Sequence, residues 1–195
     1  MIEGNETAHL GTISGPKPHA KTIGNYLMFS ILHALERAAQ LDLISDYARL
    51  PDKGGKPDFG VNLDEDRDTF LVTYGDFKVE IEAKNRGRSP KKGKIWDGYP
   101  AFNRLDYDEV HDKITGKNWS VAPDYQILVV SELSPDIFTE PALGLIEQYF
   151  GPNIVEVGYQ VLKEFDPLAT QQIFEQLLTI LAWIDQERNR KGGKP

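Results

Sequence analysis

Phe77-Lys78-Val79-Glu80-Ile81-Glu82-Ala83-Lys84 is the stretch of sequence on which the interpretation of the whole chain depends. Apolar and charged residues alternate through it without a break, so the apolar side chains share one face and the charged ones share the other. Successive side chains of a β-strand point to opposite faces, and this strict period of two therefore predicts a half-buried strand over residues 77–84.

The charged face of this predicted strand carries two carboxylates and an ammonium group. Glu80, Glu82 and Lys84 are successive residues on that face, spaced about 7 Å apart along the strand. Such a set can hold a divalent metal ion and the water that attacks a phosphate group. The alternative is an ordinary salt-bridged surface, since exposed carboxylate–lysine pairs contribute little to stability.

Composition places the chain in a broad class. Its 195 residues fit one domain with a proper core. There is no cysteine, which excludes disulfides, thiolate metal sites and a cysteine nucleophile within the chain. Neither a signal peptide nor an apolar segment of membrane-spanning length is visible, so we expect a cytoplasmic protein without membrane association.

The charge of the chain is segregated. A net charge of −8 argues against a protein that coats nucleic acid nonspecifically, because such proteins are usually basic. However, the segment from Lys84 to Lys94 is strongly basic and contains no acid. We interpret its basic side chains as phosphate contacts, with two nearby aromatic residues for groove or base contact; a solvated loop is the alternative. The residues concerned are Arg86, Arg88, Lys91, Lys92, Lys94, Trp96 and Tyr99.

Periodicity and turn residues predict the other elements. Residues 1–21 show no periodicity and are expected to form a flexible N-terminal arm. Before the charged strand, the pattern predicts a helix at 22–45 and strands at 58–63 and 69–74 that join it in an antiparallel meander. After it, the pattern predicts helices at 100–115, 139–150 and 166–190, and strands at 124–131 and 154–162.

Together these elements predict an α/β fold with a mixed central sheet, made of a three-strand meander and further strands and flanked by helices. We expect a single domain over 22–195, with a core at 22–131 and a C-terminal helix–strand–helix extension at 132–190. The apolar face of the last helix is wide and is expected to pack either on the domain or on a second subunit. Trp119 and Trp183 are expected in the core.

At this point the chain resembles the PD-(D/E)xK nuclease superfamily, which has the restriction-endonuclease-like fold. Pro57-Asp58 precedes Glu82-Ala83-Lys84, as the motif requires, and the family core also runs helix, three-strand meander, helix, strand. The resemblance covers roughly residues 22–131. Pro-Asp pairs also occur elsewhere, and Asp76-Phe77-Lys78 fits the second half of the motif, so the strand context selects this combination.

The resemblance implies a role for each matching residue. Asp58 and Glu82 would ligate Mg²⁺, for which Mn²⁺ can substitute, and the carbonyl of Ala83 would add a third oxygen. Lys84 would position or help deprotonate the attacking water. Two further carboxylates are secondary candidates: Glu80 as a second-metal or supporting group, and Glu36 because some relatives carry an acid on the first helix.

These observations predict a magnesium-dependent DNA endonuclease, of the type II restriction kind, acting on double-stranded DNA. A homodimer is expected, since cutting both strands needs two sites. The Gln-x-x-x-Tyr motif of an exonuclease branch is not found after Lys84, which favours endonuclease action. The alternatives are a repair, junction-resolving or mobile-element nuclease of the same fold, and a catalytically inactive nucleic-acid- or protein-binding module.

Overall fold

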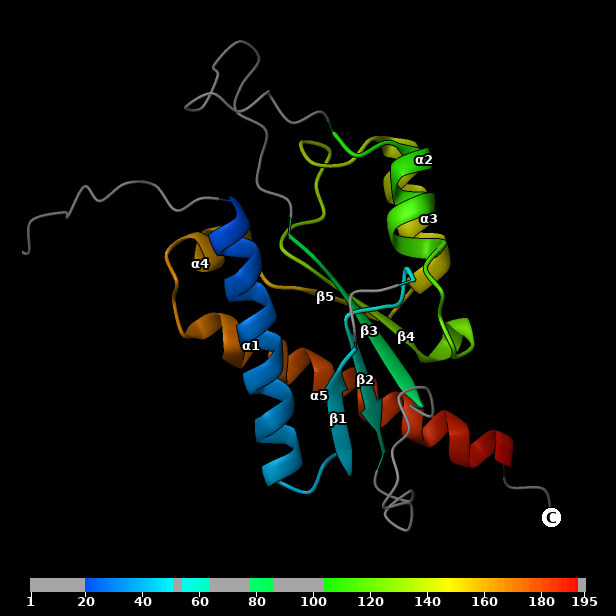
Figure 1. The fold of residues 1–195 in the computed structure, drawn as a ribbon. Helices are drawn as coiled ribbons and strands as arrows, with labels where there is room; N and C mark the ends of the chain where they lie inside the picture. Colours follow the sequence, from blue (N-terminus) through cyan, green and yellow to red (C-terminus); the bar gives the residue numbers. More distant parts are fainter. Residues whose placement is uncertain (1–19, 51–53, 64–77, 86–103, 193–195) are drawn as a thin grey trace, which may run out of the picture.

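The computed structural model describes residues 20–50, 54–63, 78–85 and 104–192. These residues form one five-stranded mixed sheet with helices packed against it (Figure 1). The strands are β1 (Asp46–Arg49), β2 (Phe59–Asn62), β3 (Val79–Lys84), β4 (Gln126–Val130) and β5 (Ile154–Glu156). The helices are α1 (Ala20–Gln40), α2 (Tyr107–Val110), α3 (Glu140–Phe150), α4 (Tyr159–Lys163) and α5 (Leu168–Gly192), with a π-helical turn η2 (His111–Thr115) and a 3₁₀ turn η3 (Pro123–Tyr125).

The sheet has the strand order β1-β2-β3-β4-β5. Its first three strands form an antiparallel meander, and β3, β4 and β5 run parallel to one another. This arrangement confirms the predicted α/β class with a mixed sheet. The strand expected at 69–74 lies outside the described residues, as do residues 1–19 of the expected arm and the basic segment after Asn85.

The meander begins with a strand that the sequence did not predict. The helix expected over 22–45 ends at Gln40, and residues 46–49 form β1. Asp42 takes a left-handed conformation with φ of 55°, while the Leu43 N–H donates to the Ala38 carbonyl at 2.9 Å. This Schellman-type turn ends α1, although apolar residues continue at helical spacing beyond it.

The two carboxylates on the charged face of β3 are not exposed to solvent. The strand itself was predicted, but Glu80 is only 3% exposed and Glu82 is 0% exposed. The expectation of a half-buried strand was wrong because β3 lies in the interior of the sheet and both of its faces are covered. One face contacts the core around α1 and α5, and the other lies under the segment from α2 to Ser120.

Elements in the second half follow the prediction closely, with two corrections. Within the described residues, the helix expected at 100–115 begins at Tyr107, where the Asp106 side chain accepts from the Glu109 N–H. The strand expected at 154–162 ends at Glu156, because Gly158, with φ of 87°, turns the chain into α4. The predictions of β4, α3 and α5 are confirmed.

The apolar residues form two cores on opposite faces of the sheet. The first joins α1 and α5 to the sheet, and the apolar face of α5 is buried there, with Ile173 and Ile184 fully covered. That helix therefore packs on its own domain, which decides between the two predicted alternatives. Trp183, expected in the core, is instead 42% exposed, and Trp119 is partly buried beside the second core. Within the described ranges, every helix is too short or too polar to cross a membrane.

Candidate functional site

Asp58 is positioned by the end of the β2–β3 pairing. Phe59 lies opposite Ile81, and the same register continued would place Pro57 opposite Ala83. Proline has no N–H with which to continue the ladder. The Asp58 carboxylate fills this place instead, since its Oδ2 accepts the Ala83 N–H at 2.8 Å. The aspartate is thereby fixed at the backbone between Glu82 and Lys84.

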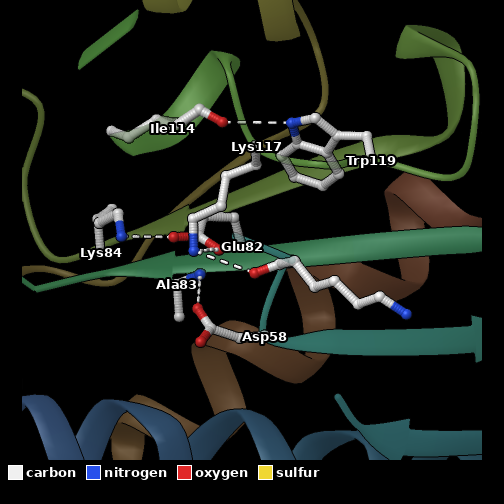
Figure 2. A network of polar contacts seen from close by, with 8 residues as sticks. Asp58, Glu82, Ala83, Lys84, Ile114, Lys117 and Trp119 are labelled. Carbon is white, nitrogen blue, oxygen red and sulfur yellow. Dashed lines mark hydrogen bonds and ion pairs between the residues drawn. The ribbon is translucent and has the colours of Figure 1, made fainter. Parts of the chain in front are cut away.

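Glu82 is a fully buried carboxylate held between two lysines (Figure 2). The Lys84 Nζ lies 2.5 Å from its Oε1, and the Lys117 Nζ lies 3.0 Å from its Oε2. Both contacts are ion pairs, and each places a positive charge against one oxygen of the buried carboxylate.

The burial of Glu82 changes its protonation. Desolvation raises the pKa of the Glu82 carboxyl from 4.5 to about 7, and repulsion from Asp58 acts in the same direction. Lys84 and Lys117 oppose the shift but do not cancel it. Near neutral pH the carboxyl is thus poised between its neutral and ionised forms, and any further positive charge beside it would favour ionisation.

Lys117 is the member of the site that sequence reasoning missed. Its Nζ contacts Glu82 and also donates to the Lys56 carbonyl at 3.2 Å, so it joins β3 to the loop before β2 (Figure 2). The neighbouring Asn118 strengthens this junction, because its N–H donates to the Gly55 carbonyl at 2.8 Å and its side-chain amide donates to Gly54. The sequence spacing between Lys117 and the motif does not predict their contact, because the position of Lys117 beside Glu82 depends on the path of a loop.

The loop that carries Lys117 is itself fixed. At Gly116, a Cβ would lie 2.6 Å from the His111 carbonyl oxygen, so only glycine fits this turn at the end of η2. After it, the Trp119 indole N–H donates to the Ile114 carbonyl at 3.2 Å, and its ring packs edge-on against Phe150. These contacts anchor the segment on both sides of Lys117.

Glu80 is not directed toward Glu82 as a second ligand. Its Oε2 accepts the Ser120 N–H at 2.7 Å, and its Oε1 accepts the Ser120 hydroxyl at 2.6 Å. Both oxygens of this buried carboxylate are thus satisfied by one residue. Glu80 therefore ties the loop after η2 to β3.

Replacing Ser120 with alanine is expected to lower the free energy of unfolding by about 1–3 kcal/mol, because the Glu80 Oε1 then loses its donor in a buried position. Urea denaturation measures the change. Ser120→Thr keeps a hydroxyl and is expected to stay within about 0.5 kcal/mol of the original protein. Equal stability of the alanine and threonine variants would show that the hydroxyl does not support Glu80.

The structure does not bring Glu36 to this site. The residue is exposed on α1, with its Oε2 3.3 Å from His33 Nδ1. Gly24, near the start of α1, lies next to Asn85 at the end of β3. Glu36 lies twelve residues further along, which is about 18 Å along the helix axis. The predicted phosphate contacts lie outside the described residues, namely Arg86, Arg88, Lys91, Lys92, Lys94, Trp96 and Tyr99.

The oxygens at the end of β3 fit the chemistry of a hard cation. Glu82 offers two buried oxygens, and Asp58 Oδ1 has no partner among the described residues. The Ala83 carbonyl points to the same side of the strand as its N–H, toward a proline that cannot donate to it. Magnesium prefers such oxygens and keeps several waters, so it needs few protein ligands.

The present geometry is not that of a closed metal cage. In the part of the chain that the structure describes, no group of three or more His, Cys, Asp or Glu side chains is arranged so that it could hold a metal ion. Figure 2 shows the Asp58 and Glu82 carboxylates on either side of the β3 backbone at Ala83. Binding one cation through both would require Asp58 to turn from the Ala83 N–H and an ammonium group to leave Glu82.

No protein-family model, curated protein or solved structure matches this chain. Function is therefore inferred from the residues and from their geometry. The distinctive chemistry is a pair of carboxylates and a pair of ammonium groups around one buried point of a central strand.

Proposed function

We propose that this chain is a magnesium-dependent DNA endonuclease of the PD-(D/E)xK type, with Asp58, Glu82 and Lys84 as its catalytic residues. One observation carries the proposal: the Asp58 carboxylate binds the Ala83 N–H at 2.8 Å, between the glutamate and the lysine of the motif. Residues 25 positions apart in the sequence thus meet at one point of β3, as a shared site requires.

The arrangement of the elements supports the same proposal. The superfamily that the sequence resembles has a core of helix, three-strand meander, helix and strand. Here α1, the antiparallel β1–β2–β3, α2 with η2, and then β4 follow in that order. The motif residues lie at the start of β2 and toward the end of β3, where the pairing of these two strands stops.

Each residue has a task that its chemistry suits. Asp58, Glu82 and the Ala83 carbonyl would hold the cation, and magnesium when bound would activate a water and stabilise charge on the phosphate. Lys84, in contact with Glu82, would orient the attacking water and offset negative charge as it develops on the phosphodiester. We further propose double-stranded DNA as substrate and a homodimer as the active form. Branched or nicked DNA as the preferred substrate would instead indicate a repair or mobile-element nuclease.

A second candidate, a non-enzymatic binding module that keeps this fold, is favoured by a different observation. Glu82 is 0% exposed and already has two ammonium partners, while Glu80 is satisfied by Ser120. This network of charges is complete without a metal ion. Metal binding therefore separates the two candidates.

A thermal titration with magnesium or manganese tests the proposal. At about 100 times the dissociation constant, a cation that binds only the folded protein adds about 2.7 kcal/mol, which is expected to raise Tm by about 5–10 °C. Glu82→Gln, which lacks the charge, is expected to shift by less than about 1 °C, and the exposed Glu36→Gln is expected to respond like the original protein. A Tm that neither metal changes would favour the binding module.

A further inference from the structure

Lys117 holds a position that the proposed function does not use. Its ammonium lies 3.0 Å from the Glu82 Oε2 and 3.2 Å from the Lys56 carbonyl oxygen. The side chain is only 15% exposed, whereas that of Lys84 is 26% exposed. A largely buried cation therefore binds two oxygens from separate segments, in the way that a metal ion would.

We infer that Lys117 is an internal competitor of the metal: its ammonium occupies Glu82 when the cation is absent and leaves it when the cation binds. This inference rests on the proposed function. Lys117 is a positioning residue in this view, because it acts through Glu82. In the metal-free protein, its positive charge lies between the Glu82 Oε2 and the Lys56 carbonyl oxygen. It therefore sets the concentration of free metal at which the site is occupied.

Geometry and electrostatics distinguish the two lysines. Lys84 belongs to the same strand as Glu82 and contacts Oε1, so it can remain beside a cation that takes the other oxygen. Lys117 reaches Oε2 from the loop after η2 (Figure 2). Its own charge repels any cation bound there, and the repulsion is strong at a few ångströms in a buried site. Its departure from Glu82 relieves that repulsion.

The test measures Mn²⁺ binding by electron paramagnetic resonance, with the unmodified protein, Lys117→Met and Lys113→Met. Measurements are made at about pH 8.5, well above the range in which carboxyl groups ordinarily titrate. Lys113→Met is the matched control, because it also removes one charge but from a lysine that pairs with Glu109 on the exposed side. We expect Lys117→Met to bind Mn²⁺ at least about tenfold more tightly and Lys113→Met to change affinity by less than about twofold.

The outcomes separate this inference from the proposed function. No Mn²⁺ binding by the unmodified protein would contradict the proposed function itself. If the unmodified protein binds Mn²⁺ but Lys117→Met binds it equally or more weakly, Lys117 is only a structural tie between loops and the inference is wrong. Removing a contact that only joins two loops would not increase the affinity for Mn²⁺.

A second measurement uses the unmodified protein and so does not depend on the folding of a variant. Reductive methylation of lysines, followed by mass spectrometry, reports how accessible each ammonium group is. Adding Mg²⁺ is expected to raise the labelling rate of Lys117 by at least about threefold, as its buried ion pair opens, and to leave that of exposed Lys113 unchanged. Unchanged or slower labelling of Lys117 at saturating Mg²⁺ would overturn the inference.

Discussion

Glu82→Gln is expected to slow magnesium-dependent cleavage of plasmid DNA by at least about 10³-fold, with no change of fold. Glutamine has nearly the shape of glutamate and leaves the packing at this 0% exposed position intact. Glutamine lacks the negative charge with which Glu82, one of the two proposed carboxylate ligands, would bind the cation. Conversion of supercoiled plasmid to nicked and linear forms over time measures the rate.

Lys84→Met is expected to cause a loss of similar size for a different reason. The variant keeps both carboxylates but removes the ammonium that lies 2.5 Å from the Glu82 Oε1. Metal binding should therefore persist, or strengthen, while cleavage fails. Together the two variants separate loss of the cation from loss of the group that orients water.

The controls use charged residues outside the site. Glu36→Gln removes an exposed carboxylate on α1 and is expected to cleave within about twofold of the original rate. Cleavage by Glu82→Gln or Lys84→Met at the original rate would rule out the catalytic assignment. Circular dichroism of each variant shows whether a loss of activity comes from unfolding instead.

The sequence predicted best those strands and helices whose hydrophobic pattern corresponds directly to their burial in the structure. β4 is a continuous apolar run and is buried on both faces, and α5 carries a wide apolar face that packs in the core. β1 was missed because the apolar spacing of α1 continues past Gln40, while the turn at Asp42 depends on a backbone conformation that this spacing does not reveal.

The site was predictable in part for a similar reason. Asp58, Glu82 and Lys84 could be selected because a recognisable motif falls on two paired strands. The burial of Glu82 could not be predicted, since alternation along β3 shows two faces but not what covers each of them. The covering groups, Lys117 and Ser120, come from a loop whose position depends on tertiary contacts.

The same charges give the site two properties that oppose each other. Glu82 without a metal is stabilised by Lys84 and Lys117, but desolvation still outweighs them and raises its pKa to about 7. Ionisation of this carboxyl is therefore unfavourable for the folded protein, whereas it is required for binding a cation. Under the proposed function, the folded protein would thus give up stability in order to present a charged ligand to the cation.

This balance leads to a prediction about stability and pH in the metal-free protein. The folded pKa of Glu82 is about 7 and the ordinary value is 4.5, so between these values the folded state binds more protons than the unfolded state. The stabilisation from the neutral carboxyl is complete below about pH 4.5 and is lost as the pH rises through about 7. At about 1.4 kcal/mol per pH unit, the loss is about 3 kcal/mol.

Chemical denaturation in the presence of a chelator, at several pH values, measures this loss against Glu82→Gln. Titrating groups remote from Glu82 contribute alike to both proteins, so the difference in unfolding free energy between them reports the titration of Glu82 and of the groups in contact with it. Relative to the glutamine variant, the original protein is expected to lose about 3 kcal/mol between about pH 4.5 and about pH 7.5. A difference that stays constant would mean that the pKa of Glu82 is the same in the folded and the unfolded protein, so that the folded carboxyl is ionised above about pH 5. The two lysines would then offset the full desolvation cost of the buried carboxylate. Glu82 would be ionised at neutral pH whether or not a cation is bound.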